Sequence, residues 1–218
     1  MKKVAVILAG CGSNDGSEIH EATLTLWALG KYDIDYQCFA LDRNQFHVIN
    51  HLEKKECQET RNMLVESARI ARGNIKDLLE LESNNFDALI LPGGFGVAKN
   101  LCNYAFQGKN FEVIPEIENI IKQFHSENKP IVALCIAPIM LAKVLKAKVT
   151  IGTDKETADI VAFVGAKHEN KNYDDICYYA DNKVITTPCY MLANTPYQIS
   201  LGIDKAIEML KQILKLIA

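Results

Sequence analysis

Residues 129–140 read KPIVALCIAPIM, and the organisation of the whole chain can be interpreted from this stretch. Pro130 ends the element that precedes it, and the wholly apolar run Ile131–Leu134 is typical of a short buried strand. Cys135 follows directly, and the apolar residues after it recur at a spacing that suits a helix. A buried strand, one reactive residue and then a helix is the order of elements in a nucleophile elbow. The stretch therefore predicts a turn that presents Cys135.

The neighbours of Cys135 suit such a turn. An elbow holds its nucleophile in a strained backbone conformation, so the residues two positions away on either side must be small. Here they are Ala133 and Ala137, where the hydrolase version of the motif carries glycines. The alternative interpretation is that Cys135 is one more buried thiol, because free cysteine is among the most buried residue types.

A second stretch indicates an anion-binding loop. Residues 86–91, FDALIL, form another expected buried strand, which runs straight into residues 92–96, PGGFG. Three glycines in four positions let backbone N–H groups turn towards an anion, as in phosphate loops and oxyanion holes. It is not a P-loop, because no Lys-Ser/Thr pair follows, and the G-x-G-x-x-G spacing of dinucleotide-binding proteins is absent. A glycine-rich turn without any ligand is the alternative.

Length and charge limit the classes of protein that fit. A chain of 218 residues can bury a substantial core, and we expect a single α/β domain over residues 1–218. A net charge of -3 and a pI near 6.0 give no reason to expect a nucleic-acid partner. No apolar run approaches the roughly 18 residues of a membrane span, so no membrane partner is expected. The amino-terminal apolar run, shorter than the roughly 7–15 residues of a secretory signal core, is interpreted as the first strand.

The cysteines indicate a reducing environment. Their number is odd, they are widely spread, and no C-x-x-C pair occurs, so neither a disulfide framework nor a zinc site is indicated. A cytoplasmic location is therefore expected. The seven cysteines are Cys11, Cys38, Cys57, Cys102, Cys135, Cys177 and Cys189.

Strand-like and helix-like segments alternate along the chain, which predicts a mostly parallel sheet covered by helices on both faces. Near the carboxyl-terminal end, residues 176–180 and 183–187 predict a β-hairpin. The other expected strands are 4–8, 36–40, 86–91, 131–134 and 149–151, with a further short one near 47–49. The expected helices are 18–30 capped by Ser17, 59–72, a turn at 77–82, 97–104, 116–127, 136–146, 157–165 and a last one after Asn194.

Sites in such sheets lie at the carboxyl ends of the strands. The loop after the first strand (residues 11–21), the glycine loop (93–96) and Cys135 should therefore share one edge of the sheet.

Several segments together carry a family resemblance that covers essentially the whole chain. The chain resembles the ThiJ/PfpI branch of the class I glutamine amidotransferase-like superfamily, and most closely the enhancing lycopene biosynthesis proteins, also described as isoprenoid biosynthesis glyoxalases. The resemblance implies a flavodoxin-like three-layer sandwich with Cys135 on the elbow. The matching segments are GCGSNDGSEIHEA, LDRNQFHVINHL, ETRNMLVESARI, LILPGGFGVAKNL, CIAPIML, TIGTD and ITTPCYMLA.

The resemblance also implies roles for individual residues. Glu21, the last acid of GSEIHE, occupies the superfamily's glutamate position, and Glu18 is the second choice. The resemblance assigns oxyanion stabilisation and substrate binding to Gly93, Gly94 and Phe95 together with the backbone N–H of Ile136.

Two departures from the family pattern argue against glutaminase chemistry. Many relatives place His directly after the cysteine, where this chain has Ile136, and amidotransferases bring a late His-x-Glu pair to the cysteine. The last histidine here is His168, so a Cys–His pair must draw on His20, His47, His51 or His168.

The expected function is a cofactor-free, metal-free glyoxalase-type lyase that converts glyoxal or methylglyoxal to a 2-hydroxy acid. Cys135, with a thiol pKa lowered by the helix start, would add to the aldehyde, and a protonated Glu21 would move the proton between the two carbons. Removal of early glycation adducts would use the same parts. The resemblance links the chain to isoprenoid biosynthesis, and a homodimer is expected.

Two other interpretations are open. In a thiol-based redox sensor or regulatory binding protein, Cys11, Cys135 and Cys189 would share one rim, and a poised thiolate oxidises whether or not it turns over substrate. A metal site built from Cys11, His20 and Cys135 is the third, although the close ligand spacing of such sites is absent.

Overall fold

The computed structural model describes residues 2–216 and places five parallel strands at the centre of one sheet. In spatial order they are β2 (Asp35–Ala40), β1 (Lys3–Ile7), β6 (Ala88–Leu91), β7 (Ile131–Leu134) and β9 (Val184–Thr187). Counted along the chain this is the order 2-1-3-4-5 of the flavodoxin-like fold, so the expected fold class is confirmed. At the edges, β5 (Ile75–Asp77) pairs parallel with β2, and β8 (Cys177–Tyr179) pairs antiparallel with β9 as the expected hairpin.

The strands form where they do because their residues are apolar on both faces. In β7 all four side chains are buried; Ile131 and Ala133 join one hydrophobic core, and Val132 and Leu134 join the other. Such continuous apolar runs are typical of a parallel strand covered by helices on both sides. The register pairs Leu91 with Ala133, so β6 and β7 end side by side and their loops meet.

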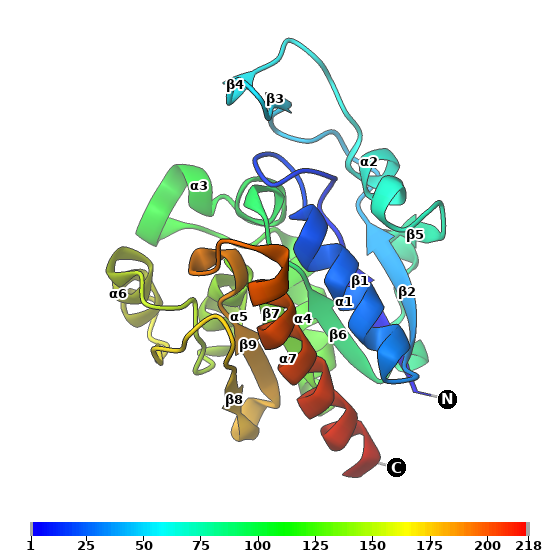
Figure 1. Ribbon diagram of the computed structural model, residues 1–218, viewed down its shortest axis with the longest axis vertical. Coiled ribbons are helices and arrows are strands. Elements are labelled where there is room, and N and C mark those ends of the chain that lie inside the picture. Colours follow the sequence, from blue (N-terminus) through cyan, green and yellow to red (C-terminus); the bar gives the residue numbers. More distant parts are fainter. Residues whose placement is uncertain (1, 217–218) are drawn as a thin grey trace.

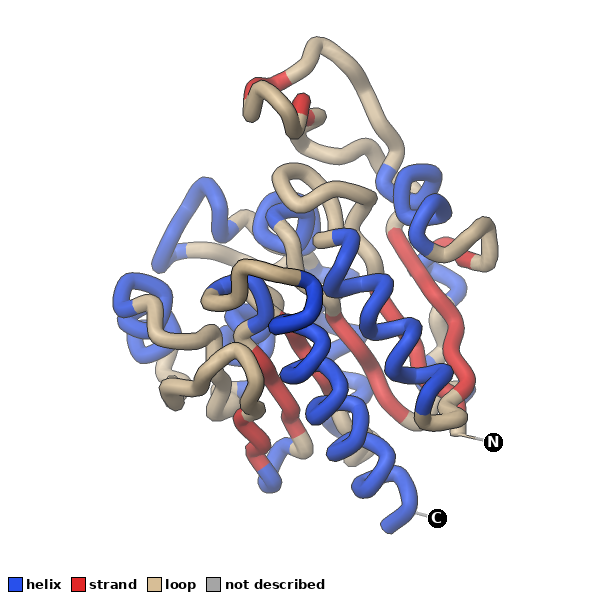
Figure 2. Tube along the Cα trace, in the orientation of Figure 1, coloured by secondary structure: helices blue, strands red, loops and turns tan. Residues whose placement is uncertain are grey.

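Helices cover both faces of the sheet (Figures 1 and 2). On one face, α1 (Ile19–Lys31) lies beside the long α7 (Pro196–Leu216). On the other, α4 (Pro115–Ser126) packs against α5 (Pro138–Leu145), which also contacts α6 (Lys155–Phe163). A shorter helix, α2 (Met63–Ile70), packs near the β5 edge. Within residues 2–216, no helix has the length and apolar character needed to cross a membrane.

Short elements gather at the carboxyl edge of the sheet. A two-stranded ribbon of β3 (Ile49–Asn50) and β4 (Lys55–Glu56) projects beyond this edge, at the top of Figure 1. A π-helical turn (Val97–Leu101) and α3 (Tyr104–Gln107) follow the glycine loop. Single 3-10 turns complete the fold at Leu78–Glu80, Ser83–Asn85, Gly108–Asn110, Ala180–Asn182 and Cys189–Met191.

The structure corrects several expected elements. Strand β5 was not predicted, because three residues at a sheet edge leave little pattern. Residues 149–151 form only an isolated bridge, between Val149 and His168. The cap of α1 is Glu18, whose carboxylate accepts from the Glu21 N–H; the Ser17 hydroxyl instead accepts from the Ala9 N–H. The helix expected from residue 59 begins only at Met63, after the Asn62 cap.

Candidate active site

Cys135 sits at the turn between β7 and α5. Its φ of 58° lies in the left-handed region, which non-glycine residues rarely adopt. The backbone N–H of Cys135 donates to the Thr187 carbonyl at 3.0 Å, and this bond ties the turn to β9. Ala133 and Ala137 are fully buried on either side. The strained, well-anchored conformation is that of a nucleophile elbow.

Glu21 reaches the sulfur of Cys135 from α1. Its side chain is completely buried, and its two oxygens accept from the Gly93 N–H at 3.1 Å and the Tyr190 N–H at 3.2 Å. It also lies next to the Cys135 thiol, and each of the two groups acts on the pKa of the other. Burial, with the nearby Glu18 as the next cause, raises the pKa of the Glu21 carboxyl to about 8, although these hydrogen bonds oppose the shift. The carboxyl is therefore mostly protonated at neutral pH.

The thiol of Cys135 has a raised pKa, not the lowered one expected from the sequence. Burial is the largest cause and the Glu21 carboxylate the second, while the N–H groups of Gly94 and Ile136 favour the thiolate. Only 8% of the residue is exposed, so desolvation of the thiolate outweighs the start of the short α5. The two N–H groups near the sulfur are where an oxyanion of bound substrate would need donors.

The glycine loop allows the elements around Cys135 to approach closely. A Cβ at Gly93 would lie 2.5 Å from both the Cys135 Cβ and the Glu21 Oε2. Gly94 has a φ of 106°, and a Cβ there would lie 2.3 Å from the Glu18 N. Any larger residue at either position would therefore push the loop away from Cys135 and α1.

A cavity of about 330 Å³ opens at Cys135; we call it the Cys135 cavity. Five of the residues named from the sequence line it, whereas Glu21 and Gly93 lie behind Cys135 and do not. Its walls are mainly apolar. The lining residues are Ser13, Glu18, Gly94, Phe95, Ala98, Tyr104, Ala105, Cys135, Ile136, Thr157, Tyr190 and Met191.

Tyr190 is a site residue that the sequence analysis did not single out. Tyr190 lines the Cys135 cavity, and its backbone N–H donates to Glu21. Its hydroxyl is 2.8 Å from the Nδ1 of His20, which is not one of the lining residues. His20 in turn lies 3.9 Å from the Glu18 carboxylate. The available signal was position: Tyr190 follows β9, whose carboxyl end lies at the same edge as that of β7.

The other three candidate histidines have partners outside the Cys135 cavity. His47 lies 3.8 Å from Glu56, and His51 lies 3.8 Å from Asp15. The Nε2 of His168 accepts from the Ile151 N–H at 3.3 Å.

Of the three cysteines of the expected rim, Cys135 and Cys189 lie together and Cys11 has different neighbours. Cys189 is fully buried against Cys135 and the two glutamates, whereas Cys11 lies near Glu66 and Arg69. Over residues 2–216, no group of three or more His, Cys, Asp or Glu side chains is placed to hold a metal ion. The site considered from Cys11, His20 and Cys135 is thus not assembled.

Comparisons with known proteins agree with this architecture. Human glutamine amidotransferase-like class 1 domain-containing protein 3, mitochondrial, is 43% identical to this chain. The match covers 98% of this chain and 83% of the human protein. The zebrafish (Danio rerio) ES1 protein, mitochondrial, is 32% identical over 99% of this chain and 86% of its own length. A crystal structure of an isoprenoid biosynthesis protein with an amidotransferase-like domain from Ehrlichia chaffeensis superposes with a TM-score of 0.90. It is 37% identical, covering 97% of this chain and 99% of that one.

The names of the relatives correct the expected location. Both curated relatives are mitochondrial proteins, so the expected cytoplasmic location is wrong. Free thiols indicate a reducing environment but do not identify the compartment.

Residues 2–190 match the DJ-1/PfpI family. With that match, the elbow at Cys135 and the relatives above, the chain belongs to the DJ-1/PfpI family.

Proposed function

We propose that the protein is a glutathione-independent glyoxalase, which converts small 2-oxoaldehydes such as methylglyoxal to 2-hydroxy acids. One observation carries the proposal: Cys135 lines the Cys135 cavity next to the buried Glu21, and the Gly94 and Ile136 N–H groups favour its thiolate form. This arrangement supplies a nucleophile, an acid/base and oxyanion donors at one point.

The first step is addition of the Cys135 sulfur to the aldehyde carbon; the thiol proton passes to water as the sulfur attacks, and Glu21 takes up a proton from water again when the cycle closes. A carbon–sulfur bond forms, and the carbonyl π electrons move to oxygen, where the N–H groups stabilise the negative charge. The raised pKa of Glu21, about 8, means that its carboxyl can give a proton to this oxygen. The products are a hemithioacetal and an ionised Glu21.

The second step moves hydrogen between the two carbons. The Glu21 carboxylate removes the proton from the carbon bound to sulfur, which gives an enediolate, and returns it to the neighbouring carbon. The result is a thioester of the 2-hydroxy acid. Water then breaks the carbon–sulfur bond and regenerates the Cys135 thiol, so that methylglyoxal plus water becomes lactic acid.

Glu18 is the alternative proton carrier. Glu18 is one of the residues that line the Cys135 cavity, whereas Glu21 is fully buried and is not. Glu18 also accepts the Glu21 N–H at 2.8 Å as the cap of α1, so its replacement affects the helix as well. Comparison of Glu18→Gln with Glu21→Gln assigns the role.

The rival function, a thiol-based sensor, needs an accessible thiol with a low pKa. Burial and Glu21 instead raise the pKa of Cys135. We therefore favour an enzyme, in which the thiolate is needed only transiently as substrate binds.

The test is incubation of purified protein with methylglyoxal in the absence of glutathione, followed by measurement of lactate. Glu21→Gln should lower turnover by at least about 10²-fold, the lower limit for general acid/base help, and Cys135→Ser should abolish it. Glu118→Gln, on the exposed side of α4 and paired with Lys122, is the matched control and should leave turnover unchanged. Ready oxidation of Cys135 by peroxide, without any Glu21-dependent turnover of small aldehydes, would favour the sensor.

A further inference from the structure

A second hollow lies beside the Cys135 cavity. Its volume is about 180 Å³. Phe95 lines both hollows, and the loop after β1 borders both, with Ser13 in one and Asn14 in the other. The two hollows are thus neighbours, separated by one aromatic side chain and one loop. The second, which we call the lysine hollow, is lined by Asn14, Ile49, Lys54, Phe95 and Lys99.

Two cations, Lys54 and Lys99, line the lysine hollow. The Lys99 ammonium donates to the Asn14 carbonyl at 2.8 Å and lies 5.6 Å from the centre of the Phe95 ring. The ion pairs found over residues 2–216 include neither Lys54 nor Lys99. Burial lowers the pKa of Lys99, although Asp15 and Glu56 partly offset it. A desolvated cation of this kind gains from a bound anion.

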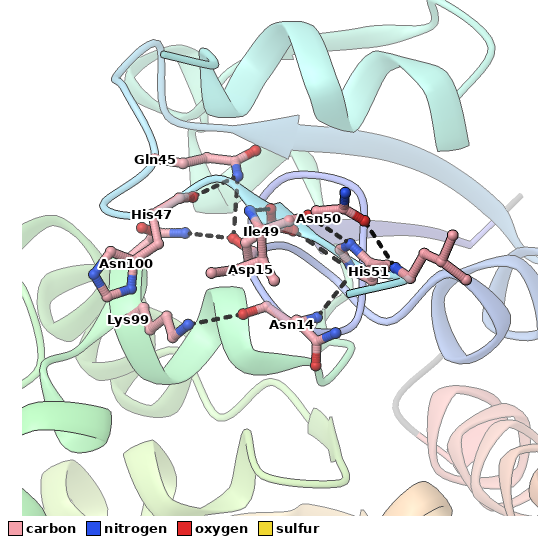
Figure 3. A network of polar contacts seen from close by, with 10 residues as sticks. Asn14, Asp15, Gln45, His47, Ile49, Asn50, His51, Lys99 and Asn100 are labelled. Atoms are coloured by element: carbon pink, nitrogen blue, oxygen red, sulfur yellow. Dashed lines mark hydrogen bonds and ion pairs between the residues drawn. The ribbon is translucent and has the colours of Figure 1, made fainter. Parts of the chain in front are cut away.

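Asp15, one of the two acids whose charges act on Lys99, is already engaged by other groups. Asp15 is buried, its Oδ2 accepts from the Ile49 N–H at 2.6 Å, and its Oδ1 lies 3.8 Å from His51. Figure 3 shows Lys99 and Asn14 together on one side of this network. Asp15 therefore fixes the backbone of both walls, while the ammonium groups remain available to a ligand.

From this arrangement we infer that the lysine hollow is a phosphate-binding subsite and that the substrate is a short carbonyl compound carrying a phosphate ester. The carbonyl would lie at Cys135, and the phosphate would lie between Lys54 and Lys99, with the chain passing Phe95. Two ammonium groups match the charge of a phosphate dianion better than that of a carboxylate, and lysine binds phosphate as a point charge. The carbonyl end of this inference rests on the proposed function.

The test measures binding without requiring turnover. Glyceraldehyde and glyceraldehyde 3-phosphate both add reversibly to a thiol, so each should protect Cys135 from alkylation by iodoacetamide. Peptide mapping measures the alkylated fraction of Cys135. The phosphorylated compound should give half-protection at a concentration at least about tenfold lower, as expected for charge-assisted hydrogen bonds. Inorganic phosphate should weaken protection by glyceraldehyde 3-phosphate and leave that by glyceraldehyde unchanged. It should give no protection alone.

Charge-removing variants locate the subsite. Lys99→Met and Lys54→Met should each remove most of the tenfold preference, whereas Lys76→Met, on the exposed side of β5, should retain it. Lys54 is exposed, so its variant keeps the test valid if Lys99→Met does not fold. Equal protection by the two aldehydes, an equal effect of Lys76→Met, or protection by phosphate alone would each overturn the subsite. Lactate formation is measured separately, so failure of the glyoxalase proposal is distinguishable from failure of the subsite.

Discussion

Replacement of Glu21 by Gln should remove a large part of the pH dependence of folding stability. The pKa of Glu21 is raised from 4.5 to about 8 in the folded protein, with burial as the main cause. Between these two values the folded state holds a proton that the unfolded state has released. The free energy of unfolding of the wild-type protein therefore falls as pH rises through this window. Below about pH 4.5 both states are protonated, and the penalty is absent.

The size of the effect follows from the same pKa values. Each unit of pKa difference corresponds to about 1.36 kcal/mol, so the Glu21 carboxyl should destabilise the folded state by about 3 kcal/mol more at pH 8 than at pH 5. Glutamine does not titrate, and so it removes this change. An amide can accept only one of the two N–H groups that Glu21 accepts, from Gly93 and Tyr190, which costs about 1–3 kcal/mol at every pH.

The assay is urea unfolding of both proteins, under reducing conditions, at pH 5 and pH 8, followed by circular dichroism. Other titrating groups cancel in the difference between wild type and variant. The wild type should therefore lose about 3 kcal/mol more than Glu21→Gln between the two pH values. Glu118→Gln, in which the replaced carboxylate is paired with Lys122 on the protein surface, should follow the wild type. Parallel changes in wild type and Glu21→Gln would show that the pKa of Glu21 is not raised.

Three further outcomes are expected. Alkylation of Cys135 by iodoacetamide should be slow at pH 7 and accelerate as pH rises, because burial raises the pKa of the thiol. In Glu21→Gln the acceleration should begin at a lower pH, because the Glu21 carboxylate also raises this pKa. The same onset in both proteins, measured by peptide mapping, would contradict the effect of Glu21 on Cys135. Gly93→Ala should destabilise the protein by about 1–3 kcal/mol in urea unfolding and lower lactate formation, since its methyl group would lie 2.5 Å from Cys135 and Glu21 atoms; Gly30→Ala, where no neighbour lies within 4 Å, is the control. Tyr190→Phe should keep the backbone hydrogen bond to Glu21 but lose the contact between the Tyr190 hydroxyl and His20. The kcat for methylglyoxal should therefore fall by about tenfold, and its pH profile should change. An unchanged pH profile would exclude a proton path through this hydroxyl.

The central strands and the elbow could be predicted because their signals are local. A continuous apolar run such as the one before Cys135 is buried on both sides only in a strand covered on both faces. The small residues on either side of Cys135 are those that a tight turn requires. The glycine loop is similar, since close approach to Cys135 and α1 requires the absence of side chains at Gly93 and Gly94. Placement of these turns at one sheet edge followed from the alternation of strands and helices.

The pKa of Cys135 and the hydrogen-bond partners of Glu21 could not be predicted from local sequence patterns. The Tyr190 N–H that binds Glu21 comes from 169 residues further along the chain, and the Gly93 N–H from 72 residues further. The sequence predicted a lowered pKa for Cys135 from its place before a helix, but burial beside Glu21 raises that pKa. Local pattern thus determined the elements and their order, because apolar periodicity and turn chemistry act over a few residues. Charge state, cavity shape and the lysine hollow depended on tertiary structure, because desolvation and long-range hydrogen bonds exist only after distant segments pack together.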